Sequence, residues 1–538
     1  MDLNLKNIKY MSHLREKGYE LPEYDIEKMR KNTEENPEWV HFGAGNIFRA
    51  FHADIADGLL KRGLMNTGII VAEGFDQAII DMAYRPFDNL SILVTLKSDG
   101  TVNKKIIGSI ADSLVLDLST PDGERLKEIF KKKSLKLATF TITEKGYSYK
   151  NSDGSVFENI KSDLSAIPTI AKSYIGMVTA LLYERFLNGR LPIALVSTDN
   201  CSENGKKLHD VIEFYVKSWV DNGLAEKGFL DYINDPSYVS FPLTMIDKIT
   251  PRPDEAVYRM LTEDRFSNME PMITTKHTFV APFVNAEESG YLVIEDNFPN
   301  GRPEMSKSGV FFTDRETVRK VEKMKVSTAL NPLHTALAVF GCLLRINKIS
   351  DEMSDPDLRK MVEILGEKEG LPVVTDPGII NPREFLYTVL NVRLNNPFMP
   401  DTPERIATDT SRKLSVRFGE TVKNYKSHNL DFTNLKIIPL VYAGWLRYLM
   451  AIDDKGNAFT LSPDPKLDEL TEKMKEFSLT GAIDSEKEKV LSDILSDEEI
   501  FGLNLNETIL AREAIEYFKK MIAGPGAIRN TIHSVVNL

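Results

Sequence analysis

A pair of glycines early in the chain is spaced for binding a phosphate group. An apolar segment, residues 39–42, leads into Gly43 and Gly45, and an amphipathic stretch begins a few residues later. In such a strand–turn–helix, the first glycine permits the tight turn, the second lets a pyrophosphate approach the backbone, and the helix N-terminus supplies free N–H groups. Phe48 replaces the third glycine of the usual dinucleotide fingerprint, so an ordinary glycine-containing turn stays open as an alternative. The residues expected to contact a dinucleotide are Gly43, Gly45, Asn46 and Arg49, the last through its charge.

Two acidic residues follow the second apolar segment, residues 68–72, and bear on the choice of cofactor. Glu73 comes directly after this segment and Asp76 lies three positions later, with no Lys or Arg between them. An acidic residue at this point holds the ribose diol of NAD, and its charge repels the 2′-phosphate of NADP. The sequence therefore predicts NAD as cofactor, bound by Glu73 and Asp76. The alternative is that both are ordinary surface acids.

Polar residues also stand in apolar surroundings at residues 141–147 (TITEKGY), 197–205 (STDNCSENG) and 325–334 (KVSTALNPLH). Asn331 and His334 are three positions apart, so they share one helix face, and the rest of that helix is apolar. A polar face on a buried helix is costly unless it has partners. A core histidine with a capping asparagine explains His334 alone, but it explains the full set of Lys325, Asn331, His334 and Asn200 less well.

With GAGNIFRAF (residues 43–51), MIDKITP (245–251) and VIEDNFPNGRP (293–303), these motifs resemble the polyol-specific long-chain dehydrogenase family, the mannitol dehydrogenase and hexuronate oxidoreductase group. The resemblance implies a Rossmann-type domain, a helical domain and metal-independent hydride transfer with NAD. It is strongest to the branch that interconverts D-mannonate and D-fructuronate. Altronate (tagaturonate) or mannitol oxidation, and a catalytically inactive NAD-binding sensor, remain the alternatives.

The same resemblance implies the roles of the polar residues. Lys325 corresponds to the general acid/base, Asn200 and Asn331 to the residues that bond the reacting oxygen, and His334 to a residue that orients the substrate. The chemistry agrees, because amide N–H₂ donors stabilise the negative charge that forms on a ketone oxygen during hydride transfer, and a protonated amine completes the alcohol.

The spacing between the lysine and the asparagine differs from that of the family. It is six residues from Lys325 to Asn331 here, against five in the family. At about 100° per residue, a regular helix would turn Asn331 well away from the face of Lys325. We therefore expect Lys325 to lie in an irregular or bulged turn, with Lys323 as the alternative base.

A sugar acid also requires a cation near its carboxylate. Arg393 is the first choice because it adjoins a Pro-bounded turn, and Lys145 is the second. The full set of candidates is Lys145, Lys248, Arg252, Arg393, Arg405, Arg412, Lys413 and Arg417.

Strand-like and helical segments alternate up to about residue 200, which predicts an α/β fold with a mostly parallel sheet; from about residue 315 helical periodicity dominates. The candidate strands are residues 39–42, 68–72, 90–96, 137–142 and 192–197. We expect a surface extension over residues 1–37, a Rossmann-type NAD-binding domain over 38–300 and a mainly helical substrate-binding domain over 301–538. The Pro-, Gly- and Asn-rich segment 296–308 is the expected linker.

The composition excludes several classes of function. With 67 basic and 79 acidic residues among 538, the net charge of −12 disfavours nucleic acid and anionic membranes as partners. Two cysteines and eight scattered histidines predict no metal site. The first 36 residues are charged and lack the apolar segment of a secretion signal, so we expect a cytoplasmic protein. A small-molecule sugar acid or polyol is the expected partner of a monomer or small homo-oligomer.

Overall fold

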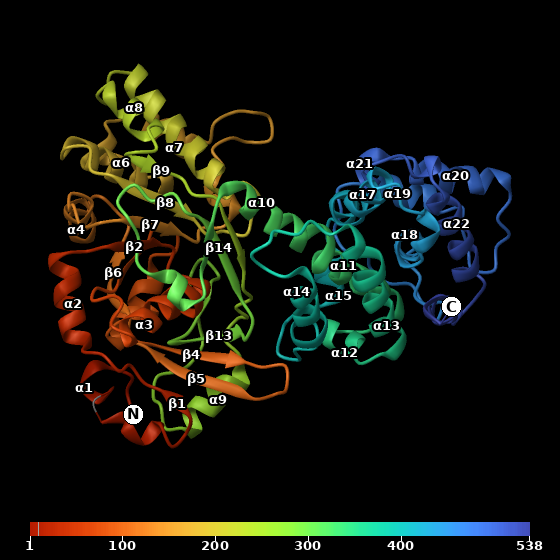
Figure 1. Cartoon of the computed structure of the whole chain (residues 1–538), viewed down its shortest axis with the longest axis horizontal. Coiled ribbons are helices and arrows are strands. Elements are labelled where there is room, and N and C mark those ends of the chain that lie inside the picture. Colours follow the sequence, from red (N-terminus) through yellow and green to blue (C-terminus); the bar gives the residue numbers. More distant parts are fainter. Residues whose placement is uncertain (9, 538) are drawn as a thin grey trace. The chain divides into compact units, whose positions relative to one another are not determined.

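The computed structural model describes residues 1–8 and 10–537, which form two units (Figure 1). The N-terminal unit comprises Met1–Lys97 and Thr101–Val318, and the helical unit comprises Ser98–Gly100 and Arg319–Leu538. The two units divide at Val318, which is 18 residues after the boundary expected at residue 300. Segment 296–308 lies inside the N-terminal unit, where Arg62 donates to the Lys307 carbonyl and to Ser308 Oγ. Its Pro and Gly residues mark a loop between two paired strands rather than a domain boundary.

The N-terminal unit is built on a six-stranded sheet in the order β6-β3-β2-β7-β8-β9, with all neighbours parallel. Its strands are β2 (Trp39–Phe42), β3 (Ile69–Glu73), β6 (Ile110–Val115), β7 (Leu137–Phe140), β8 (Ile193–Ser197) and β9 (Val239–Ser240). Every residue of β2, β3, β7 and β8 is buried, which is why these strands read as continuous apolar runs rather than alternating ones. The predicted α/β class with a parallel sheet is confirmed.

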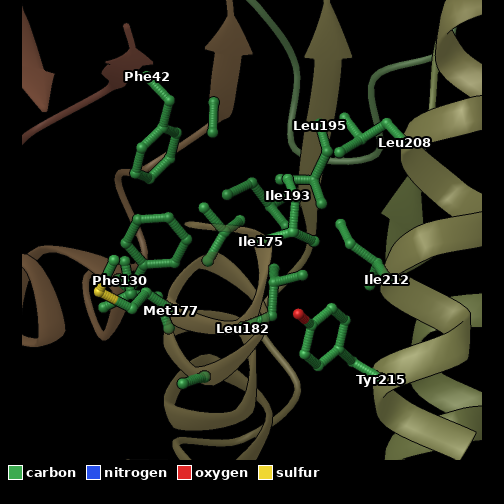
Figure 2. Packing of buried hydrophobic residues seen from close by; sticks show 14 of the residues in the cluster. Phe42, Phe130, Ile175, Met177, Leu182, Ile193, Leu195, Leu208, Ile212 and Tyr215 are labelled. Carbon is green, nitrogen blue, oxygen red and sulfur yellow. The ribbon is translucent and has the colours of Figure 1, made fainter. Parts of the chain in front are cut away.

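Helices cover this sheet and complete the core. Figure 2 shows Phe42, Ile193 and Leu195 of the sheet packing near residues of α6 (Tyr174–Leu187) and α7 (Asn204–Asp221). The six parallel strands are thus fixed by apolar contacts, and their carboxyl ends lie along one edge where loops can carry functional groups. The remaining helices of the unit are α1 (Leu5–Ile8), α2 (Ile26–Glu35), α3 (Ala53–Lys61), α4 (Pro121–Phe130), α5 (Glu158–Leu164), α8 (Gly228–Asn234) and α9 (Glu255–Glu263).

Smaller sheets flank the parallel one. A four-stranded sheet has the order β1-β5-β4-β13, and a three-stranded sheet has the order β10-β14-β15. Segment 90–96, expected in the parallel sheet, forms β4 of the four-stranded sheet instead, where it pairs antiparallel with β5 and parallel with β13. The strands are β1 (Tyr19–Glu20), β4 (Ser91–Leu96), β5 (Val102–Ile107), β10 (Thr244–Asp247), β13 (Phe283–Glu287), β14 (Tyr291–Glu295) and β15 (Phe311–Thr313), with a separate pair β11 (Met272–Ile273) and β12 (Phe279–Val280).

The first 37 residues are part of this unit rather than a surface extension. Leu3 and Leu14 are fully buried, and strand β1 pairs with β5. Tyr19 Oη donates to Asp264 at 2.7 Å. These contacts join segments far apart in the chain, and no local pattern in residues 1–37 could have indicated them.

The helical unit surrounds α18 (Ile437–Tyr448), every residue of which is buried. It packs against α11 (Asn331–Leu344) and α22 (Ile509–Met521). Glu369 accepts the N–H groups of Lys436, Ile437 and Ile438 at 2.6–3.0 Å and so caps α18. The other helices include α10 (Arg315–Met324), α12 (Ile349–Met353), α13 (Pro356–Ile364), α14 (Pro382–Thr388), α15 (Pro403–Ile406), α16 (Thr410–Leu414), α17 (Glu420–Ser427), α19 (Leu467–Met474), α20 (Ser485–Leu495), α21 (Glu498–Phe501) and α23 (Ala527–Val536).

One stretch, Arg315–Leu344, is long and apolar enough to cross a membrane on composition alone. Its apolar window is 83% buried inside the protein, as expected for a core helix.

Candidate active site

The glycine turn after β2 has room for a phosphate group on one side only. Gly43 has φ +110°, and a Cβ there would lie 2.3 Å from the Thr141 carbonyl oxygen. Only glycine fits this position, because both the backbone conformation and the close approach of Thr141, which directly follows β7, exclude a side chain. A Cβ on Gly45 would meet nothing within 4 Å, so the space beside it is open. The turn therefore fits the role expected for it, with Gly43 making the bend and Gly45 leaving room for a pyrophosphate.

Glu73 fixes the shape of this turn. Its carboxylate accepts the N–H of Ala44 at 2.7 Å, of Phe75 at 2.7 Å and of Asp76 at 3.0 Å. Asp76 in turn accepts the hydroxyl of Thr274 at 2.6 Å. Both acids are buried, at 5% and 3% exposure, so neither is an ordinary surface acid. The contact of either acid with a ribose stays a prediction. A carboxylate has about four acceptor sites, and Glu73 uses three of them here, which leaves one.

Arg49 forms a hydrogen bond with Asn46, next to the glycine turn. It is fully buried in the π-helical segment Phe48–His52, and it donates to the Ala281 carbonyl at 2.6 Å and to Asn46 Oδ1 at 3.0 Å. Burial lowers the pKa of this guanidinium. Since Arg49 bonds groups of the protein itself, this geometry gives it a role in orienting Asn46 rather than the direct phosphate contact expected from its charge. Phe48, in the place of the third glycine, points into the core and stacks on His41 with ring centroids 4.4 Å apart.

The ends of β7 and β8 are joined by Asp199, which sequence reasoning missed. Its carboxylate accepts the N–H of Ile142 at 3.0 Å, the N–H of Thr143 at 2.8 Å and the hydroxyl of Tyr147 at 2.5 Å. Burial raises the pKa of Asp199, and these donors oppose the rise. Thr143 has φ +65° and ψ 159°, a conformation that is strained for a β-branched residue and that persists only where its surroundings hold it.

Two predicted site residues lie in the loops that Asp199 connects. Asn200 directly follows it and is exposed, and Lys145 is exposed in the short helical turn Glu144–Tyr147. The N-terminal unit thus brings Asn200 and Lys145 to the same edge of the sheet as the glycine turn. The signal that could have indicated Asp199 is its position as an acid one residue before Asn200, just after a fully buried strand.

In the helical unit, Lys325 begins a π-helical turn, Lys325–Ala329. The N–H of Leu330 donates to the Lys325 carbonyl at 3.2 Å, a bond that spans five residues, and the α-helix resumes at Asn331. The bulged turn expected from the spacing is confirmed. Such a turn takes up one extra residue, so a spacing of six places the two side chains about as five would in a regular helix.

The two candidate lysines have different surroundings. Lys325 is 4% exposed. The Lys323 side chain is 44% exposed, and its Nζ lies 3.4 Å from Glu420 Oε2. This difference supports Lys325 over Lys323 as the candidate base.

His334 faces Asp401, a second residue that sequence reasoning missed. His334 Nε2 and Asp401 Oδ2 are 3.3 Å apart, and Asp401 also pairs with Arg405. Burial lowers the pKa of His334. Asp401 raises this pKa in part, and the positive charges of Arg393 and Arg417 lower it further. The imidazole is therefore neutral near pH 7. Burial alone would raise the pKa of Asp401, but His334 and the nearby arginines bring it below its usual value.

The candidate cations divide between the two units. Arg393, Arg405, Lys413 and Arg417 belong to the helical unit, and their charges reach His334, Asp401 or one another. In the N-terminal unit, Lys248 donates to the carbonyls of Glu287 and Ser289 at 2.6 and 3.1 Å, and the Arg252 guanidinium lies 4.2 Å from the centre of the Phe279 ring. Among the residues that the structure describes, no group of three or more His, Cys, Asp or Glu side chains could hold a metal ion.

A parallel sheet with a glycine turn at its carboxyl edge, in one chain with a helical unit carrying a buried lysine, an asparagine and a histidine, defines the class of dinucleotide-dependent dehydrogenases. Residues 37–307 match the family model of the mannitol dehydrogenase Rossmann domain, and residues 317–522 match that of the mannitol dehydrogenase C-terminal domain. The chain therefore belongs to the mannitol dehydrogenase family, as the sequence motifs predicted.

Individual relatives agree with this assignment. The chain is 52% identical over 539 residues to the D-mannonate oxidoreductase of Thermotoga maritima, covering 100% of this chain and 99% of the relative. It is 29% identical over 443 residues to the D-mannonate oxidoreductase of Escherichia coli, covering 80% and 83%.

Two solved structures share the fold. D-sorbitol dehydrogenase in substrate-free form has a TM-score of 0.78 at 22% identity, covering 99% of this chain and 100% of that one. Pseudomonas fluorescens mannitol 2-dehydrogenase, in a ternary complex with NAD and D-mannitol, has a TM-score of 0.68 at 25% identity, covering 100% and 99%.

Proposed function

We propose that this protein is an NAD-dependent oxidoreductase that interconverts D-mannonate and D-fructuronate. The observation that carries the proposal is the full-length 52% identity to a D-mannonate oxidoreductase. The cations gathered around His334 support a sugar acid as substrate, since a neutral polyol needs no such charge.

NAD would bind at the turn of Gly43 and Gly45, with Asn46 beside it. The open space over Gly45 and the N-terminus of the following helix suit its pyrophosphate. When bound in reduced form, this cofactor supplies the hydride for the keto carbon.

The protein's own groups handle the charge on the oxygen. As the ketone is reduced, the amide N–H₂ groups of Asn200 and Asn331 donate to the oxygen and stabilise its growing negative charge. Lys325 then gives a proton to that oxygen, and it takes the proton back when D-mannonate is oxidised. His334, kept neutral by burial and held against Asp401, orients the substrate.

Arg393 and Lys145 are the cations proposed to attract the substrate carboxylate. The Arg393→Ala variant is expected to raise KM for the uronate more than KM for a neutral ketose. An equal effect on both would remove Arg393 from this role. We place the enzyme in the cytoplasm, as a monomer or small homo-oligomer acting on a small molecule.

The proposal is tested by following NADH oxidation with D-fructuronate, D-tagaturonate and D-fructose in parallel. D-fructuronate should give the highest kcat/KM. Preference for tagaturonate would assign an altronate enzyme, and preference for fructose a mannitol enzyme. Binding of NADH without turnover of any of the three would indicate a sensor.

A further inference from the structure

A second arginine near His334, Arg417, is half-buried and has no acid paired with it among the described residues. Arg417 lies in the π-helical turn Ser415–Gly419, which packs against α11 and the Lys325–Ala329 turn. Its Nη1 donates to the hydroxyl of Thr335. Within the part of the chain that the structure describes, no carboxylate lies within ion-pair distance of this guanidinium. Burial lowers its pKa to about 10, and no acid opposes that effect.

Three fully buried arginines of this protein have more acceptors than Arg417, although Arg49 Nε and Arg447 Nε have none among the described residues. Arg185 donates to five backbone carbonyls at 2.7–3.0 Å. Arg447 donates to two carbonyls, and Arg49 to a carbonyl and an amide oxygen. A guanidinium has five N–H donors, and burying its charge is costly unless an anion or several acceptors receive them. Arg417 is half-buried and gives one of its five donors to a side chain of the protein, so its remaining N–H groups are available to a ligand with suitable acceptors.

The position of Arg417 connects it to the reacting groups. Thr335, which accepts from Arg417, donates its own hydroxyl to the Asn331 carbonyl at 3.0 Å, and it adjoins His334. Arg417 thus contacts the helical turn that carries Asn331 and His334. One turn rises about 5.4 Å. In D-fructuronate three carbon atoms separate the keto carbon from the carboxylate, so the distance between these two groups is comparable to the rise of one helical turn.

The neighbouring charges also favour an anion here. Burial, and after it the charge of Arg417, lowers the pKa of Lys413 to about 8. Arg417 likewise disfavours protonation of His334. The repulsion between these positive charges decreases when a carboxylate binds between them.

We propose that Arg417 determines specificity for sugar acids by holding the substrate carboxylate through paired N–H bonds. This inference rests on the proposed function. The planar fork of arginine matches the two oxygens of a carboxylate, which a hydroxymethyl group in the same place does not.

The test compares D-fructuronate with D-fructose in the Arg417→Gln, Arg417→Lys and Arg383→Gln variants. Arg383→Gln is the matched control, because it removes the same charge from an exposed position on α14 of the helical unit. Hydrogen bonds to a charged group are worth about 1.5–3 kcal/mol, so Arg417→Gln should raise KM for fructuronate about 10- to 100-fold. Fructose kinetics and the control should be nearly unchanged, and Arg417→Lys should lie between because it keeps the charge without the fork.

Each outcome decides one claim. Equal changes for both substrates in Arg417→Gln, or an unchanged KM for fructuronate, overturn the role of Arg417, and a KM effect confined to Arg393→Ala would move the anchor to that residue. If thermal unfolding shows that Arg417→Gln does not fold, Arg417→Lys carries the test, and an unchanged KM for fructuronate in that variant overturns the proposal. A wild-type enzyme that does not reduce fructuronate refutes the proposed function instead.

Discussion

Replacing Lys325 by alanine should nearly abolish turnover, whereas replacing Lys323 should not. The two lysines are only two positions apart, but the π-helical turn that begins at Lys325 buries its side chain, and Lys323 is exposed beside Glu420. A general acid/base contributes roughly 10²–10⁴-fold to the rate, which is about 3–5 kcal/mol of activation free energy. An exposed ion pair such as Lys323–Glu420 contributes at most about 1 kcal/mol to stability and nothing to the chemical step.

The assay measures kcat for NADH-dependent ketone reduction in Lys325→Ala, Lys323→Ala and the wild type. NADH affinity, measured by fluorescence titration, should be unchanged in both variants, because the glycine turn belongs to the N-terminal unit. Thermal unfolding checks that each variant is folded.

Two results would refute this reasoning. If Lys323→Ala loses activity and Lys325→Ala keeps it, the π-helical turn does not present Lys325 to the substrate. If neither variant falls more than about tenfold, below the range of acid/base catalysis, the lysine mechanism is wrong and His334 becomes the next candidate for proton transfer.

Three further predictions concern the cofactor, metal and stability. NADH should give a higher kcat/KM than NADPH, because the Glu73 and Asp76 carboxylates lie at the end of β3, and equal or better use of NADPH would contradict this. Activity should survive EDTA, since Asn200, Asn331 and Lys325 handle the oxygen charge; full loss with recovery on adding a divalent ion would overturn the mechanism. Glu352 is fully buried with neither oxygen hydrogen-bonded by a described residue, and burial raises its pKa well above normal. An unfolded glutamate ionises near pH 4.3, so stability should fall as pH rises above that value, by up to about 1.4 kcal/mol per unit. Glu352→Met should remove this dependence and stabilise the protein at pH 8 in thermal unfolding; an unchanged pH slope would refute the assignment.

Local patterns in the sequence were sufficient for the elements that position the site. Buried parallel strands give unbroken apolar runs, so β2, β3, β7 and β8 could be located within a few residues. One extra residue between Lys325 and Asn331 was sufficient to predict an irregular turn, because helical geometry leaves few ways to absorb it.

Features that depend on distant parts of the chain could not be predicted. Segment 90–96 has the pattern of a buried strand, but that pattern does not say which sheet it joins. The charge of Arg49 indicated a phosphate contact, and only the fold shows that Ala281 and Asn46 receive its N–H groups. Asp199 and Asp401 each act through partners more than fifty residues away in the sequence: Asp199 through the N–H groups of Ile142 and Thr143, and Asp401 through His334.

The most direct test of the account follows the hydride itself. D-fructuronate is reduced with NADH whose C4 hydrogens are both replaced by deuterium, in the presence of EDTA, and the product is analysed by NMR. The account predicts D-mannonate with a single deuterium at C5. A product without deuterium at that carbon, or no reaction where tagaturonate or fructose is reduced readily, would contradict it.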